Sequence, residues 1–69
     1  MNPDLNSERT IQMVYTNHRG ETSVRRLVPI RIYFGKTEWH PADQWLLEAY
    51  DFDRAATRSY ALKEIRAIF

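Results

Sequence analysis

Arginine is the residue type that points most directly to chemistry in this chain, because eight of its ten basic side chains are guanidinium groups. A planar, forked guanidinium suits the recognition of carboxylate or phosphate oxygens better than a lysine ammonium does. Arg25, Arg26 and Arg31 fall within one short segment, which predicts a local positive patch. The net charge of the whole chain is only +1, which argues against a protein that coats a polyanion.

Aromatic rings beside such arginines would add a second kind of contact, since a base stacked on a ring contributes ~1–3 kcal/mol. Nucleotide-like ligands and short single strands of nucleic acid offer both a phosphate and a base. A histidine can donate to the same phosphate. These residue types predict an anion-binding surface made of Arg26, Arg58, Tyr15, Tyr33, His40 and Arg25.

The two leading arginines also have purely structural interpretations. By strand parity Arg26 falls among apolar positions, where an arginine is costly unless it is paired. Arg26 therefore predicts either an internal salt bridge or a ligand site. Arg58 alternates with Tyr60 and is either a ligand contact or a solvated side chain near Asp51 or Asp53.

No arrangement of catalytic residues stands out. No serine lies in a Gly-x-Ser-x-Gly turn, and two glycines are too few for a phosphate-cradling loop. His40 has Glu38 and Asp43 as neighbours, but no second histidine lies at a metal-ligand spacing and there is no cysteine. The sequence therefore predicts a protein that is not an enzyme, with no metal and no cofactor. The enzyme alternative requires His40 beside a carboxylate in a deep pocket.

Alternating apolar and polar residues predict the strands that position these side chains. The first strand covers residues 10–16 and ends in a turn that contains Gly20, a residue that tolerates the positive φ of hairpin turns. The next strand covers residues 21–34. It contains Pro29, which cannot donate to a ladder and so predicts a bend.

The second half of the chain continues in short strands. They are expected over residues 44–52, 56–61 and 65–69, with a helical turn over residues 62–64. A helix that begins near Leu62 and runs to the end is the alternative, because the same residues also fit helical spacing.

Both tryptophans are expected to be core or cap residues, because buried aromatic rings dominate small cores. Trp45 lies in a predicted strand, and Trp39 lies in the irregular loop 35–43. In that loop, either Trp39 caps the barrel or the loop forms one wall of a pocket.

Five short strands without an internal repeat predict a mainly β fold, a small five-stranded SH3-like or Sm-like barrel. A chain of 69 residues holds one small domain, predicted over residues 10–69, behind a flexible tail at residues 1–9. There is no apolar run long enough to span a membrane and no secretory signal, so a cytoplasmic protein is expected.

Several segments within residues 10–66 together resemble a known family. Arg25-Arg26 followed by Pro29, the strand Trp45-Leu46-Leu47, and Arg58-Ser59-Tyr60-Ala61-Leu62 are together similar to the signature of WYL domains. Residues 33–41, which run into Gln44-Trp45-Leu46-Leu47, are a tighter match to a compact subgroup found as stand-alone proteins and as appendages to other bacterial domains. The resemblance implies an SH3-like barrel from a bacterial regulator that senses a ligand, with nucleotides or single-stranded nucleic acid proposed. The alternative is an interaction module that forms a homodimer or docks on a neighbouring protein, since such barrels often associate through strand edges.

Overall fold

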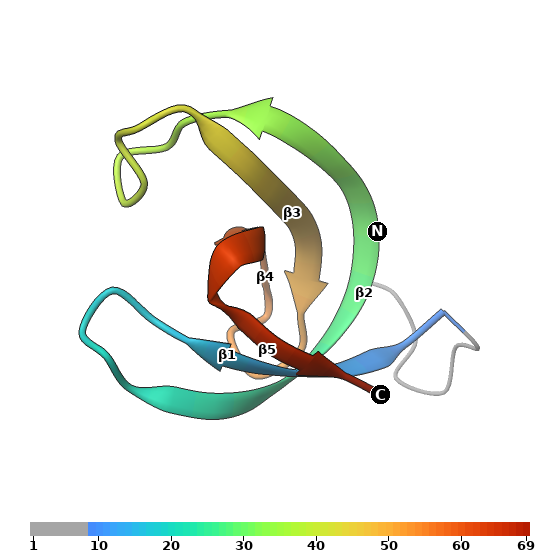
Figure 1. Cartoon of the computed structure of the whole chain (residues 1–69). Helices are drawn as coiled ribbons and strands as arrows, with labels where there is room; N and C mark the ends of the chain where they lie inside the picture. The colour runs from blue at the N-terminus through green and yellow to red at the C-terminus, as the bar shows by residue number, and fades with distance from the viewer. Residues whose placement is uncertain (1–8) are drawn as a thin grey trace.

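Five β-strands make up the computed structural model, which describes residues 9–69. In chain order these elements are β1 (Ile11–Thr16), β2 (Thr22–Gly35), β3 (Gln44–Asp51), β4 (Ala56–Ala61), the 3-10 turn η1 (Leu62–Glu64) and β5 (Ile65–Ile68). The strands form one antiparallel sheet in the order β4-β3-β2-β1-β5, which curls on itself as Figure 1 shows. The mainly β, small-barrel fold predicted from the sequence is confirmed.

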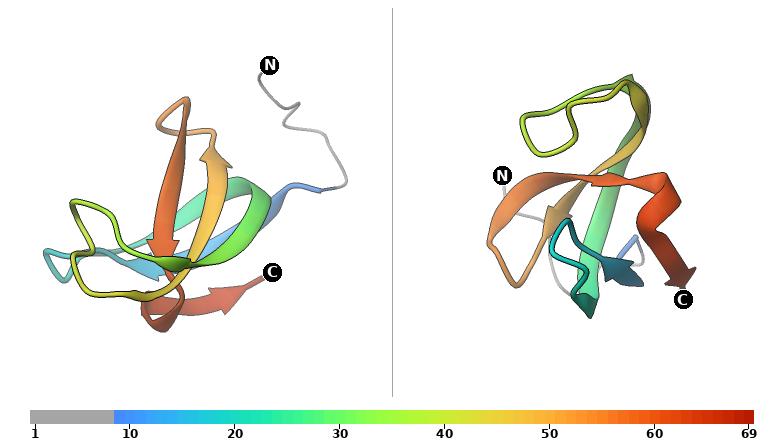
Figure 2. Two further views of the ribbon diagram at one scale, coloured as in Figure 1. Left: turned by 90° about the horizontal axis from the view of Figure 1, so that it is seen from above. Right: turned by 60° about the vertical axis from the view of Figure 1, so that its left-hand side comes forward.

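The long strand β2 explains how so few strands curl into a barrel-like sheet. Its residues 22–27 pair with β1, whereas residues 27–35 pair with β3. The register shifts between Pro29 and Arg31, where the proline has no N–H to give to the ladder. The bend predicted at Pro29 is therefore confirmed, and Figure 2 shows β2 as one curved strand shared by both halves of the sheet.

The core lies inside this curl. It is built from alternate residues of the strands, as half-buried strands require. The buried cluster consists of Met13, Tyr15, Leu27, Leu47, Ala49 and Tyr60, with Ile11 and Ile65 packed against it.

Arg25 and Arg26 point to the opposite faces of the sheet from those that were predicted. Arg25 pairs in register with the fully buried Met13, and only 16% of its side chain is exposed. Arg26 pairs with Gln12 on the outer face, where half of its side chain is exposed. The prediction failed because it assumed that the apolar residues after Pro29 lie on the buried face, and it extended that alternation back across the bend to Arg26. Beyond the bend those residues, among them Ile32 and Phe34, are more than half exposed.

Neither tryptophan is a core residue, so the core interpretation of the two rings is wrong. Trp39 is 59% exposed and Trp45 is 56% exposed. Trp45 packs edge-on against Phe34, with ring centroids 5.3 Å apart at the far end of the β2–β3 hairpin. Trp39 lies in the loop after β2, and its ring contributes to the wall of a cavity, which is the second alternative proposed for that loop.

The β1–β2 turn is fixed by one side chain. Asn17 Oδ1 accepts hydrogen bonds from the backbone N–H groups of Arg19 at 2.9 Å and Glu21 at 3.0 Å. Gly20 takes a φ of +79°, which an L side chain would adopt only with strain. The turn therefore holds its shape through local interactions and presents His18 at its tip.

The end of the chain follows the turn-plus-strand prediction rather than the helix alternative, with η1 leading directly into β5. The tail predicted over residues 1–9 lies outside the described residues except for Arg9. Within residues 9–69, no helix is long and apolar enough to cross a membrane.

Candidate anion-binding cavity

A cavity of about 200 Å³ opens where the β1–β2 turn, the β2–β3 loop and strand β4 meet. Its walls combine aromatic rings, imidazoles and guanidinium groups: Tyr15, Asn17, His18, Trp39, His40, Arg54, Arg58, Ser59 and Tyr60. A second hollow of about 430 Å³ shares five of these residues and extends toward Lys63 and Glu64 on η1. Ligand sites commonly measure roughly 300–1,000 Å³, so the first cavity suits a single phosphate, ring or group of similar size.

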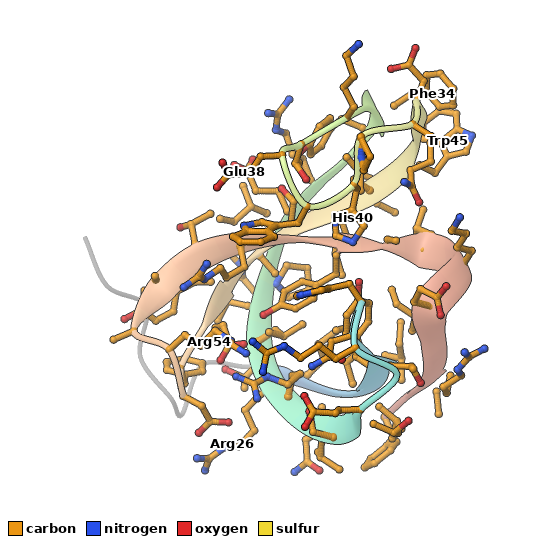
Figure 3. All side chains as sticks on the ribbon, turned by 90° about the vertical axis from the view of Figure 1, so that its left-hand side faces the viewer. Arg26, Phe34, Glu38, His40, Trp45 and Arg54 are labelled. Atoms are coloured by element: carbon orange, nitrogen blue, oxygen red, sulfur yellow. The ribbon has the colours of Figure 1, made fainter. Side chains whose placement is uncertain are left out.

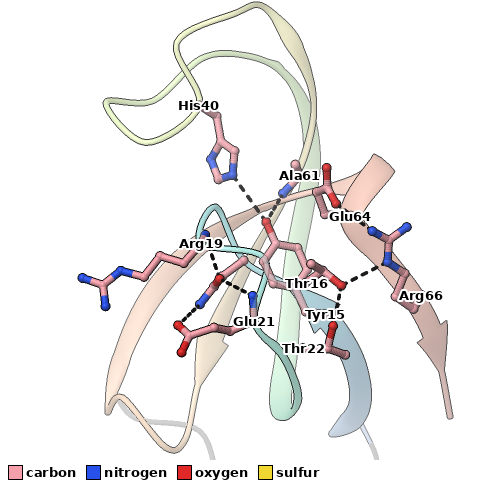
Figure 4. Close-up of polar contacts among 10 residues, drawn as sticks. Tyr15, Thr16, Arg19, Glu21, Thr22, His40, Ala61, Glu64 and Arg66 are labelled. Atoms are coloured by element: carbon pink, nitrogen blue, oxygen red, sulfur yellow. Dashed lines mark hydrogen bonds and ion pairs between the residues drawn. The ribbon is translucent and has the colours of Figure 1, made fainter.

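The Tyr15 hydroxyl forms the floor of this cavity. Tyr15 is buried, and its oxygen accepts a hydrogen bond from the backbone N–H of Ala61 at 3.1 Å. The same hydroxyl lies 3.4 Å from Nε2 of His40, which reaches down from the β2–β3 loop (Figure 4). Burial raises the pKa of Tyr15, partly offset by the bond from Ala61. The ring therefore stays a neutral hydrogen-bonding group at physiological pH.

His40 is held by its own loop as well as by Tyr15. Its backbone N–H donates to Thr37 Oγ1 at 3.0 Å, and its Nδ1 lies 3.2 Å from the same oxygen. Burial lowers the pKa of His40, and the charges of His18 and Lys63 lower it further against the opposing effect of Glu64. In the described residues its side-chain hydrogen-bond partners are hydroxyls and not carboxylates.

The rim of the cavity carries a stacked pair of rings. His18 from the β1–β2 turn and Trp39 from the β2–β3 loop lie nearly parallel, at an interplanar angle of 20° with centroids 5.5 Å apart. The two residues join loops that are remote in sequence. Because Trp39 is more than half exposed, much of its indole surface remains open to a second planar group.

The cationic side of the cavity comes from Arg54 and Arg58. Arg54 lies in the β3–β4 turn, and Arg58 lies on β4 opposite Ala49 of β3. Four other arginines of the described chain are neutralised by carboxylates, namely Arg25, Arg26, Arg31 and Arg66. Within residues 9–69, no ion-pair partner satisfies Arg54 or Arg58, so their charges remain available to an anion.

A buried carboxylate positions the turn that carries Arg54. Asp51 is fully buried, and its Oδ1 accepts hydrogen bonds from the backbone N–H groups of Asp53 at 2.9 Å and Arg54 at 3.2 Å. Its Oδ2 accepts from the Tyr60 hydroxyl and from Arg25, whose Nη2 lies 2.8 Å away. Side chains from β2 and β4 thus converge on one carboxylate of β3.

The titration behaviour of this cluster follows from its contacts. Burial alone would raise the pKa of Asp51, but the hydrogen bonds from Tyr60 and Arg25 outweigh it and the pKa is lowered. Burial and the bond to Asp51 raise the pKa of Tyr60. Asp51 therefore stays ionised while Tyr60 stays protonated, which is the state that the hydrogen bonds need.

The structure brings together three of the six residues predicted to bind a ligand: Tyr15, His40 and Arg58 line one cavity. The other three lie elsewhere. Arg25 is engaged by Asp51, and Arg26 by Asp53 at 2.9 Å. Figure 3 places Arg26 at the opposite end of the molecule from the loop that carries His40. Tyr33 donates or accepts a 2.8 Å hydrogen bond with Ser59, and its ring lies 4.4 Å below the Arg31 guanidinium carbon.

Six of the nine cavity residues are not predicted as ligand contacts by the sequence pattern, and His18, Arg54 and Trp39 are the three on which the site depends most. His18 and Arg54 fall in turns that the pattern leaves exposed, and Trp39 is expected to be a core or cap residue. The signal that could have identified these three residues is their position in the chain, because both turns and the loop connect strands of one small barrel. Connections of that kind carry binding residues more often than the strands do.

Comparison with known proteins agrees with the architecture. The fold defines a small SH3-like barrel with an aromatic and cationic cavity at one end. The model of the WYL domain family matches residues 5–69, so this chain belongs to the WYL domain family, whose members are regulatory, ligand-sensing modules.

Among solved structures, the chain is similar to proteasome accessory factor B/C (PafBC) of Arthrobacter aurescens, with a TM-score of 0.68 and 24% sequence identity. The match covers 88% of this chain but only 9% of that protein, so the likeness concerns the barrel fold alone. No curated protein matches this chain.

Proposed function

We propose that this WYL domain binds, without chemistry, an anionic ligand that carries a planar ring, either a nucleotide or a short stretch of single-stranded nucleic acid. The observation that carries the proposal is the meeting in one cavity of the His18–Trp39 stack with Arg54 and Arg58, two guanidinium groups that have no ion-pair partner within residues 9–69. Arginine forks suit phosphate oxygens, and an exposed indole suits a base.

The remaining cavity residues fit the same ligand. His40 and the Tyr15 hydroxyl offer hydrogen bonds deeper in the cavity. The one carboxylate in the adjoining hollow, Glu64, is paired with Arg66 at 3.0 Å and so repels an anion less than a free acid would. Within residues 9–69 the ring of His40 bonds to hydroxyls, an arrangement that favours ligand binding over acid–base catalysis.

The test uses adenosine monophosphate and a short oligothymidylate as probes, titrated into the protein and followed by calorimetry. The double variant Arg54→Gln, Arg58→Gln removes both free charges without removing a structural ion pair. A hydrogen bond to a charged group contributes about 1.5–3 kcal/mol, so each replaced arginine is expected to weaken binding by about tenfold or more.

The matched control for each single replacement, Arg54→Gln or Arg58→Gln, is Arg26→Gln, because Arg26 is an exposed arginine outside the cavity and its loss also removes one formal charge. We expect affinity for both probes to change by no more than about twofold in this variant, because Arg26 lies outside the cavity and its charge is already paired with Asp53. Equal loss in Arg26→Gln and in the cavity variants would indicate general charge attraction and would refute the cavity as the site.

A further inference from the structure

The second half of β2 has a free edge. Residues 30–35 pair with β3 on one side. The pairing of β2 with β1 ends at Leu27, so no strand of the described chain covers the other side of residues 30–35. In Figure 1 this part of β2 forms the outer rim of the molecule. A row of unpaired backbone N–H and C=O groups is a template for another strand.

The side chains along this edge are apolar and exposed. The exposed fractions are 52% for Ile30, 58% for Ile32 and 57% for Phe34, and the neighbouring Trp45 is 56% exposed. Figure 3 shows Phe34 and Trp45 side by side at the tip of the hairpin, away from Arg54. Contiguous apolar surface of this kind on a small domain marks an interaction site.

The charge that usually protects such an edge is neutralised here. Arg31 is the one charged residue in this segment, and its Nε donates to Glu48 at 2.6 Å within the same molecule. The Glu48 hydrogen bond and charge raise the pKa of Arg31. An ion-paired arginine repels a second strand much less than the isolated edge charges by which proteins prevent pairing.

We propose that residues 30–34 of β2 pair antiparallel with the same residues of a second copy of this chain, about a two-fold axis at Ile32. Two identical strands related by a two-fold axis run antiparallel, which is the geometry of an isologous interface. In this register Ile32 lies opposite its copy, and Ile30 lies opposite Phe34 of the partner.

The same two-fold pairing also places the polar residues of the two strands in favourable contacts. Arg31 of one copy lies opposite Tyr33 of the other, so that each guanidinium meets a ring and the two arginines are not opposed. The same two residue types already contact each other within one chain, where the guanidinium carbon is 4.4 Å from the ring centre. Arginine over an aromatic face is favourable. A foreign strand would need to reproduce this order of apolar, cationic and aromatic residues, whereas a second copy supplies it.

The interface is separate from the cavity, because none of residues 30–35 lines it. It is also short, and stable dimers usually bury about 1,200–2,000 Å². The dimer is therefore weak and depends on concentration, so a trapping experiment detects it more sharply than a single measurement of mass.

The trap is the variant Ile32→Cys in a chain that has no other cysteine. Directly opposed residues of antiparallel strands have Cα atoms about 4.5–5.5 Å apart, within the about 4.4–6.8 Å that a disulfide spans. The matched control is Gln12→Cys, an exposed position on β1, which is paired on both sides. We expect mild oxidation to cross-link Ile32→Cys at least about tenfold faster than Gln12→Cys. Equal rates would overturn the proposal.

A charge swap tests the two-fold register independently. In Ile32→Lys or Ile32→Glu, like charges face each other across the axis, and opposed like charges destabilise strand pairs. Each variant alone should sediment as a monomer at concentrations where the parent dimerises, and an equimolar mixture of the two should dimerise again. A parent that stays monomeric throughout, or a mixture that stays monomeric, would overturn the homodimer and leave the edge to a different partner.

Discussion

The substitution Asp51→Asn is expected to destabilise the barrel far more than Asp53→Asn, although both residues pair with an arginine of β2 at nearly the same distance. The Arg25–Asp51 pair is 2.8 Å long with the carboxylate fully buried, and the Arg26–Asp53 pair is 2.9 Å long with side chains 50% and 39% exposed. The two pairs therefore differ in burial, and Asp51 also accepts a hydrogen bond from the Tyr60 hydroxyl.

The magnitude follows from the bonds that each change removes. In the Asp51→Asn variant the amide keeps an oxygen for the backbone N–H groups of the turn, but Arg25 and the Tyr60 hydroxyl lose their charged partner. Hydrogen bonds to charged groups contribute about 1.5–3 kcal/mol each, which predicts a loss of about 3 kcal/mol. Asp53→Asn should cost less than about 1 kcal/mol, as exposed pairs do.

Thermal unfolding measures the difference directly. A change of 1 kcal/mol shifts the Tm of a domain of this size by about 4–8 °C, so Asp51→Asn should lower it by about 12–24 °C. The pKa of Asp51 is lowered by folding, so its contribution is present above about pH 4 and is lost as the pH falls toward the folded pKa. Asp51→Asn should show a flatter stability profile in that acid range. Equal Tm losses in the two variants would refute the argument from burial.

Three further changes test other parts of the structure. Tyr15→Phe leaves the buried N–H of Ala61 without an acceptor and should cost about 1–3 kcal/mol, with faster hydrogen exchange at that amide. Ala55 has a positive φ of 50°, so Ala55→Gly should relieve backbone strain and raise the Tm by a few degrees or leave it unchanged. A clear fall in the Tm would contradict the claim that Ala55 is strained. Affinity for oligothymidylate, a phosphodiester of constant charge, should rise as the pH falls below about 6.5, because the anion favours a protonated His40 whose pKa is lowered in the free protein. His40→Gln should make the affinity less dependent on pH, and an unchanged slope would exclude His40 as the group whose protonation favours binding.

The strand pattern is accessible from the sequence because period-two alternation and turn residues both act locally. The strand predicted over residues 56–61 has the bounds of β4, and the bend at Pro29 follows from a missing N–H. The prediction of which residues face the core and which face solvent is wrong across that bend. Alternation is a local rule, and the register shift after Pro29 depends on how β3 pairs with β2.

The candidate site is only half predictable for a related reason. Residue type alone selects Tyr15, Arg58 and His40, and they do meet in the cavity. Arg25 and Arg26 have the same chemistry, but a long-range partner neutralises each, and sequence spacing cannot reveal a contact between residues 26 or 27 positions apart. Residue type does not single out Arg54, because its place in the cavity depends on Asp51, which accepts its backbone N–H and fixes the turn.

The most direct test of the ligand site uses the two tryptophans as reporters within one molecule. Trp39 lines the cavity, whereas Trp45 lies with Phe34 at the tip of the β2–β3 hairpin. The measurement is a titration of adenosine monophosphate followed by the two indole N–H resonances in NMR spectra. Binding in the cavity should shift the Trp39 resonance in a saturable way and leave that of Trp45 nearly unmoved. Saturable shifts of Trp45 alone, or no saturable shift of Trp39, would contradict the account.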